Sequence, residues 1–278
     1  MIGSTIEKEV TPLLTLAVGL NQVDKIVIDG WNDRLNLPTK EAEKQIERRA
    51  DDIVAKLSAY SNLSVSHIEY YSALKRYRLE NLLSKVIMFT RQGFRLDDVE
   101  PQPWWDLAEE DVREFILQER QKRQNPKEAL RGSKEYLFEE LQQLLPADVL
   151  KQVKDEFHEV RRTPAKVAIL GKAGVGKTTT VNNLFNAQWK TSHTFVGTTE
   201  MQADEFSLPT GGTLTVIDLP GYGRSLAEDR QYESIYREVI KYCDLVLLII
   251  QANSRDLADD QEMICKLSQW LKEFNSSL

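Results

Sequence analysis

The feature that most constrains the fold is the pattern G-x-x-x-x-G-K-[ST], which residues 171–178 match at every fixed position. The sequence K-V-A-I-L at 166–170 before it is typical of a buried strand, and residues 179–185 after it begin a helical pattern. A glycine-rich loop between a strand and a helix turns successive backbone N–H groups inward, where they can bind phosphate oxygens. The pattern therefore predicts a nucleotide-binding α/β fold.

A second motif, D-L-P-G at 218–221, follows a predicted strand over 213–218. An Asp at this place can hold Mg²⁺ through water, and a glycine N–H can bond the γ-phosphate, so that the loop responds to that phosphate. The two motifs together give these predicted nucleotide-binding residues: Gly171, Lys172, Ala173, Gly174, Val175, Gly176, Lys177, Thr178, Thr179, Asp218 and Gly221.

The residues around these motifs predict a mostly parallel sheet. Predicted strands at 202–208 and 213–218 are joined by a short turn, and they must be antiparallel because a parallel pair needs a crossover of about a dozen residues or more. The apolar run 245–250 is typical of a strand that is covered on both faces.

Between the two motifs lies V-G-T-T-E at 196–200. With this segment, the phosphate loop, the hairpin and D-L-P-G in order, residues 165–274 resemble the Era/TrmE/HSR1-type GTPases. The resemblance implies GTP and GDP as ligands and Mg²⁺ as cofactor. It implies that Thr199 contacts the metal and the γ-phosphate, with Thr198 as the alternative. The implied metal ligands are Thr178, Thr199 and Asp218.

The predicted catalytic residues are Lys177, Thr199, Gly221 and Tyr222. Ras-like proteins have a glutamine where Tyr222 stands, and that amide orients the attacking water. A phenol can bond a water but lacks the paired donor and acceptor of an amide. We therefore expect a regulatory switch, or an enzyme whose hydrolysis is slow and assisted by a partner.

Two other classes of protein remain open. The phosphate loop also resembles that of ParA/MinD-type ATPases, in which a lysine at the position of Lys172 reaches a phosphate across a dimer. The hairpin favours the GTPase interpretation, so Lys172 is predicted to be an ordinary solvent-facing residue. The third possibility is a non-catalytic interaction protein that keeps a remnant phosphate site.

The chain divides near residue 163 into a predicted all-α helical accessory domain, 1–162, and a GTP-binding domain, 163–278. Charged residues and leucines at helical spacing dominate the first part. S-H-I-E at 66–69 is typical of a capping box. The predicted helices of this part are 39–60, 66–92, 106–124, 126–144 and 146–160. The predicted fold is thus a P-loop NTPase domain preceded by helices.

The GTPases of this class read guanine with an N-K-x-D motif after the strand that follows a helix such as the predicted 259–274. No such motif follows that helix in this sequence. We therefore expect either a truncated product or a degenerate member. In both cases strand 245–250 would be an open sheet edge, which invites pairing with a protein partner or a second copy.

Composition indicates which partners and which cellular compartment to expect. A net charge of −7 argues against nucleic acid as the main partner. The two cysteines lack metal-ligand spacing and suit a reducing compartment. The N-terminus does not read as a secretory signal, and the apolar runs, such as 13–20, are too short to span a bilayer. We expect a cytoplasmic protein.

Overall fold

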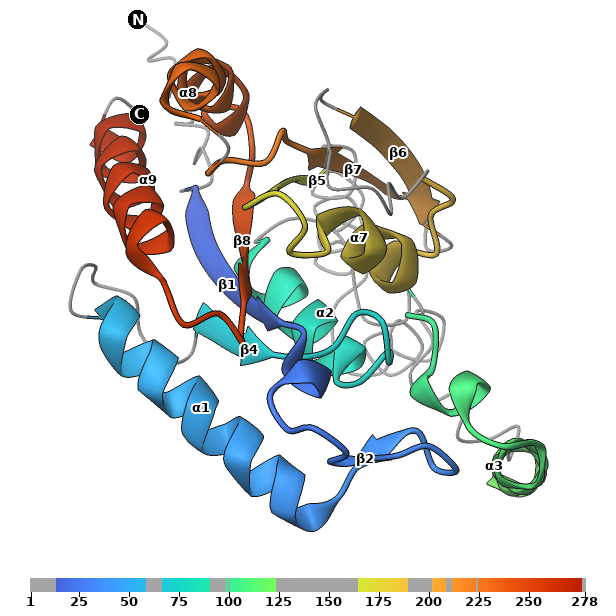
Figure 1. Ribbon diagram of the computed structural model, residues 1–278. Helices are drawn as coiled ribbons and strands as arrows, with labels where there is room; N and C mark the ends of the chain where they lie inside the picture. The colour runs from blue at the N-terminus through green and yellow to red at the C-terminus, as the bar shows by residue number, and fades with distance from the viewer. Residues whose placement is uncertain are drawn as a thin grey trace, which may run out of the picture.

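The structure is a computed structural model that describes residues 14–58, 67–90, 99, 101–123, 165–189, 202–208, 212–223 and 225–276. Its centre is a six-stranded sheet in the order β4-β1-β8-β5-β7-β6 (Figure 1). The strands are β1 (Thr15–Asn21), β4 (Ile68–Tyr70), β5 (Ala165–Gly171), β6 (Gln202–Leu208), β7 (Gly212–Asp218) and β8 (Leu245–Gln251). Neighbouring strands are parallel except β6 and β7, which are antiparallel. The mostly parallel sheet with one antiparallel hairpin strand is confirmed.

Strand β8 is not at an edge of this sheet. It lies between β5 and β1, and its pairing with β1 runs in register from Thr15 opposite Leu245 to Asn21 opposite Gln251. The prediction of an open edge that a partner or second copy covers is therefore wrong. The same chain supplies the neighbouring strand.

The prediction of an all-α region over 1–162 is also wrong, because β1 and β4 belong to the same sheet as the phosphate loop's strand. Strand β1 reads T-L-A-V-G-L-N, and six of its seven residues are buried. This is the near-continuous apolar pattern of a parallel strand covered on both faces. Such a short apolar run cannot be told from a buried helix segment by periodicity alone.

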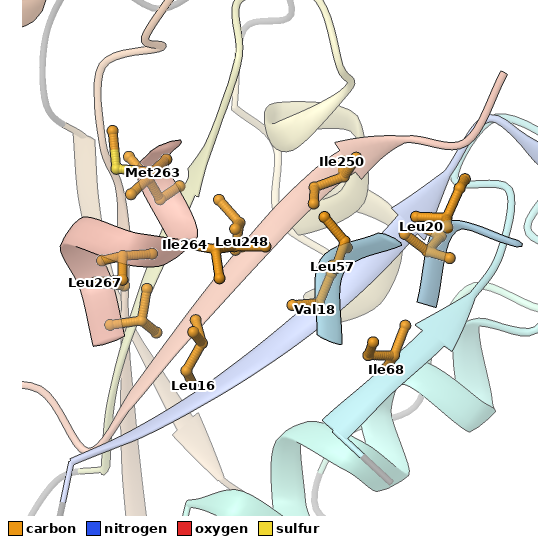
Figure 2. Packing of buried hydrophobic residues seen from close by; sticks show 14 of the residues in the cluster. Leu16, Val18, Leu20, Leu57, Ile68, Leu248, Ile250, Met263, Ile264 and Leu267 are labelled. Carbon is orange, nitrogen blue, oxygen red and sulfur yellow. The ribbon is translucent and has the colours of Figure 1, made fainter. Parts of the chain in front are cut away.

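Helices cover both faces of the sheet (Figure 1). One face packs against α1 (Lys40–Ser58), α8 (Leu226–Ile240) and α9 (Ala258–Ser276), and the other against α2 (Leu79–Phe89) and α7 (Lys177–Phe185). Side chains alternate between the faces along β1, where Leu16 and Val18 join the first core and Ala17 joins the second. Figure 2 shows the first core, in which residues of β1, β4 and β8 meet Leu57 of α1 and Met263, Ile264 and Leu267 of α9.

The remaining elements lie beside this core. They are η1 (Val23–Lys25), the antiparallel pair β2 (Trp31–Asn32) and β3 (Leu37–Pro38), η4 (Trp104–Leu107) and α3 (Glu110–Arg123). None of the described helices is long and apolar enough to cross a membrane.

The predicted helices 39–60 and 259–274 are confirmed as α1 and α9. The predicted helix 106–124 begins later than expected, because the chain is extended at Ala108 after η4 and α3 starts at Glu110. The prediction for 66–92 is wrong in its first half, which holds β4 and a turn. Glu69 does not act in a capping box, because its Oε1 accepts a hydrogen bond of 2.9 Å from Arg78 Nε. Arg78 has a φ of 58° and precedes the true helix start at Leu79. The predicted helices 126–144 and 146–160 lie outside the described residues.

We predict that Leu20→Ala destabilises the whole sheet. Leu20 is fully buried in β1, and truncation of a buried leucine costs about 2–5 kcal/mol of unfolding free energy. Urea denaturation measures the loss, and hydrogen exchange should quicken at the amides of β5 and β8 as well as β1. The control Ile28→Ala removes a side chain that is 89% exposed and should change stability by less than about 0.5 kcal/mol. Unchanged hydrogen exchange in β5 and β8 would show that residues 1–162 and 163–278 fold independently.

Candidate nucleotide-binding site

The phosphate loop connects the end of β5 to the start of α7. Gly174 and Gly176 have φ values of 80° and 92°, which glycine adopts without strain. Lys177 begins α7 and is only 4% exposed. Its Nζ donates to the carbonyl oxygens of Gly171 at 3.3 Å and Lys172 at 3.5 Å, so the ammonium lies across the loop. A charge fixed in this way suits the β- and γ-phosphates of a nucleotide.

The predicted metal ligands Thr178 and Asp218 come together. Thr178 Oγ1 donates to Asp218 Oδ2 at 2.9 Å, and Asp218 is fully buried at the end of β7. A hydroxyl and a carboxylate are hard oxygen ligands, and Mg²⁺ is usually bound by one or two carboxylates together with phosphate oxygens and water. The donor set at this position therefore fits Mg²⁺.

The loop after β7 lies directly against the phosphate loop. A Cβ added to Gly221 would approach Ala173 N to 2.8 Å, and Ala173 N donates to Tyr222 O at 3.3 Å. The Tyr222 side chain is 2% exposed, and its hydroxyl donates to Asp260 Oδ1 of α9 at 2.7 Å. Its placement in the core does not match the predicted role of binding an attacking water.

Lys172 is not the solvent-facing residue that the sequence predicted. Its Nζ lies 3.1 Å from carboxylate oxygens of both Asp259 and Asp260, and its side chain is 21% exposed. Burial lowers the pKa of Lys172, but the two carboxylates outweigh burial and raise it above the ordinary value. The Lys172 ammonium thus pairs with carboxylates of its own chain.

Residues 21–24 at the end of β1 and residues 71–73 after β4 lie beside the phosphate loop and form the second half of the candidate site. Asn21 Nδ2 donates to Val175 O at 2.8 Å, and Asn21 Oδ1 accepts from Ala73 N at 2.9 Å. A Cβ at Gly176 would lie 2.6 Å from Asn21 Nδ2, so this close approach requires glycine. Asn21 therefore ties the phosphate loop to the turn after β4.

Further contacts join the two halves. Gln22 Nε2 donates to Gly174 O at 3.0 Å, and Asn183 Nδ2 of α7 donates to Ala73 O at 2.8 Å. The hydroxyls of Tyr71 and Thr180 are 2.9 Å apart in the core. These bonds fix residues 21–24 and 71–73 beside the loop that would hold the phosphates.

Residues 21–24 read N-Q-V-D, which matches the N-K-x-D motif except for Gln22 in place of lysine. Oδ1 of Asp24 is buried and accepts no hydrogen bond from the described residues. The motif was expected beyond helix 259–274, whereas this similar pattern lies at the end of β1. The signal was an N-x-x-D pattern directly after the apolar run 13–20, and β1 occupies the place beside β8 where the missing strand was expected.

Some predicted residues cannot be placed. Thr198 and Thr199 of the G-T-T segment lie outside the described residues. The predicted residues of the loop, Gly171 to Thr179, and Asp218 and Gly221 are all described and lie together around the end of β5.

Comparison with known proteins finds a family match for the part of the chain that holds the phosphate loop. Residues 166–276 match the family described as 50S ribosome-binding GTPase. This segment of the chain is therefore similar to the GTPase domains of that family. The match does not include β1 and β4, which complete its sheet.

The chain is similar to two uncharacterised proteins of Escherichia coli (strain K12). It is 32% identical to YfjP over 45% of this chain and 45% of that protein, and 33% identical to YkfA over 42% and 41%. It is also 31% identical to the GTPase HflX of Caldanaerobacter subterraneus over 36% of this chain and 24% of that protein. The matches thus span less than half the length of each of these relatives.

We predict that Asn21→Asp disrupts the site although it preserves the shape of the side chain. The second carboxylate oxygen would face Val175 O in place of a donor, and a buried carbonyl left without its donor costs about 1–3 kcal/mol of unfolding free energy. Urea denaturation measures the loss. The matched control is Asn32→Asp, because Asn32 Oδ1 only accepts from Leu35 N in an exposed turn and aspartate keeps that bond. Equal stability of the two variants would contradict the role given to Asn21.

Proposed function

We propose that this chain binds GTP and GDP with Mg²⁺ and acts as a nucleotide-dependent switch with slow intrinsic hydrolysis. The observation that carries the guanine preference is the buried Oδ1 of Asp24, which accepts no hydrogen bond from the described residues. Burial of such an oxygen without a donor costs about 1–3 kcal/mol. A ligand that brings N–H donors to this place would recover that cost.

The chemistry of the bases favours guanine at this carboxylate. Guanine presents N1–H and the N2 amino group side by side, and both are donors that one carboxylate can accept. Adenine has an acceptor at N1 and no amino group at C2, so it would leave Asp24 unpaired. Asn21 and Gln22 hold this segment on the phosphate loop through Val175 O and Gly174 O.

The phosphate half of the site supports the same ligand. In this proposal Lys177 and the N–H groups at the start of α7 bind the phosphates, and Thr178 and Asp218 hold the metal, which the contacts of Lys177 with the loop and of Thr178 with Asp218 support. When bound, Mg²⁺ would neutralise charge on the β- and γ-phosphates. Thr199 remains the proposed further ligand of the metal and the γ-phosphate.

Slow hydrolysis is proposed because the residue after the D-L-P-G glycine is poorly placed to orient water. The Tyr222 hydroxyl is buried and donates to Asp260. Efficient turnover would then need groups from a protein partner, as it does in GTPases that receive an arginine from outside.

We predict that Asp24→Asn changes the base preference. An amide can donate to the C2 carbonyl oxygen of xanthine, whereas it cannot accept both donors of guanine. GDP affinity should fall about tenfold or more, as expected for loss of a hydrogen bond to a charged group. XDP affinity should rise, and titration calorimetry with GDP, XDP and ADP measures all three.

The matched control is Asp29→Asn, which changes the same charge on an exposed residue nearby. Asp29 has a φ of 56°, a conformation that asparagine tolerates. This variant should bind the three nucleotides as the unchanged protein does. A wild-type protein that prefers ADP to GDP would overturn the guanine assignment.

We predict that the purified protein hydrolyses GTP in single turnover at about 10⁻⁴ to 10⁻² per second, the range of unassisted GTPases. Quench-flow or manual quenching with labelled GTP measures the rate. Lys177→Ala should abolish it, which controls for contaminating hydrolases. A rate near those of partner-assisted GTPases without any partner would contradict the proposal.

A further inference from the structure

Four side chains from three separate segments meet beside the phosphate loop. Tyr222 comes from the loop after β7, Lys172 from the phosphate loop, and Asp259 and Asp260 from the first turn of α9. Tyr222 donates to Asp260 Oδ1 at 2.7 Å, and Lys172 Nζ lies 3.1 Å from Asp260 Oδ2 and 3.1 Å from Asp259 Oδ2. We call Tyr222, Lys172 and Asp260 the α9 cluster.

Two members of the α9 cluster are buried, and Lys172 is partly buried beside them. Asp260 is 1% exposed and Tyr222 is 2% exposed. Burial raises the pKa of Asp260, while the hydrogen bond from Tyr222 and the charge of Lys172 oppose that rise. Removal of one partner from a buried ion pair is strongly destabilising, because the remaining charge has lost its compensation. Tyr222 and Lys172 thus both stabilise the buried carboxylate of Asp260.

The cluster fixes the segment that follows D-L-P-G at two points. The backbone is held where Ala173 N donates to Tyr222 O, and the Tyr222 side chain is held by α9. Gly223 has a φ of 78°, and a Cβ on it would lie 3.4 Å from Asp259 Oδ2 and from Lys172 Cγ. The chain therefore turns sharply over the cluster, with Gly221 directly before this turn and beside Ala173.

We propose that the α9 cluster positions the Gly221 N–H for the γ-phosphate and thereby links the presence of that phosphate to α9. The inference rests on the proposed binding of GTP and GDP. Tyr222 is then a positioning residue that acts through the backbone of Gly221 and does not touch the nucleotide. Because GDP lacks the γ-phosphate, the cluster should matter for GTP and not for GDP.

The test compares Tyr222→Phe with the unchanged protein. The variant keeps the buried ring and removes only the hydroxyl that bonds Asp260. With Mg²⁺ present, the Kd for a non-hydrolysable GTP analogue should rise about tenfold, if the bound state depends on the full strength of the hydrogen bond between Tyr222 and the Asp260 carboxylate. The Kd for GDP should change less than about twofold. The control Tyr242→Phe removes the hydroxyl of a residue that is 68% exposed, and it should change neither constant.

Two more variants test whether the effect is selective for the GTP analogue or comes from a general loss of structure. Lys172→Met keeps the aliphatic stem and removes the charge, and Asp260→Asn removes the carboxylate; both should also weaken the GTP analogue selectively. The double variant with Tyr222→Phe and Asp260→Asn should lose less binding free energy for the GTP analogue than the two single variants lose together, because the residues act as one unit.

The outcomes separate this inference from the proposed function. Equal weakening of the GTP analogue and GDP would show that the cluster only supports the fold, and would overturn the inference. Unchanged binding of both in Tyr222→Phe would overturn it as well. A wild-type protein that binds neither nucleotide would instead overturn the proposed function.

Discussion

The pairing of β1 with β8 is the constraint on which the rest of the structure depends. Strand β8 is buried over Leu245–Ile250 and needs a strand on each side, since unpaired backbone groups would otherwise face an apolar environment. Strand β1 fills one side with a ladder along its full length. Because parallel strands end at the same edge, β1, β5 and β7 bring Asn21, Gly171 and Asp218 to one place, where ligands bind in open α/β sheets.

Much of the C-terminal part could be predicted from sequence because its signals are local. The strand and helix around the phosphate loop, the hairpin of β6 and β7 and the buried strand β8 each follow from a short pattern. The role of β1 could not be predicted in this way. Its apolar run fits a buried helix segment or a strand equally well, and its partner β8 lies more than two hundred residues away in sequence.

The residues of the candidate site also differ in how far they could be predicted from local sequence patterns. The residues proposed to bind the phosphates could be predicted because they fall in two short motifs, 171–178 and 218–221. The residues proposed to bind the base were expected after helix 259–274, whereas N-Q-V-D lies at the end of β1. The proposed contact of Asp24 with the base requires that Asp24 lie near the phosphate loop in space, but it does not require that N-Q-V-D follow the loop in sequence. The predictions that Lys172 faces solvent and that Tyr222 binds a water failed for a related reason. Their exposure depends on Asp259 and Asp260 of α9, which no pattern at the phosphate loop reveals.

Hydrogen bonds between the two halves give nucleotide binding a consequence for the whole sheet. Asn21 donates to Val175 O in a buried bond and Asn183 donates to Ala73 O in a partly buried one. The segments that would hold base and phosphates therefore cannot separate without breaking these contacts. A ligand that binds only the folded state stabilises it by about 2.7 kcal/mol at a hundred times its Kd. A nucleotide that touches both halves would add this free energy to the β1–β8 pairing itself. The ligand and the β1–β8 pairing would then stabilise one another.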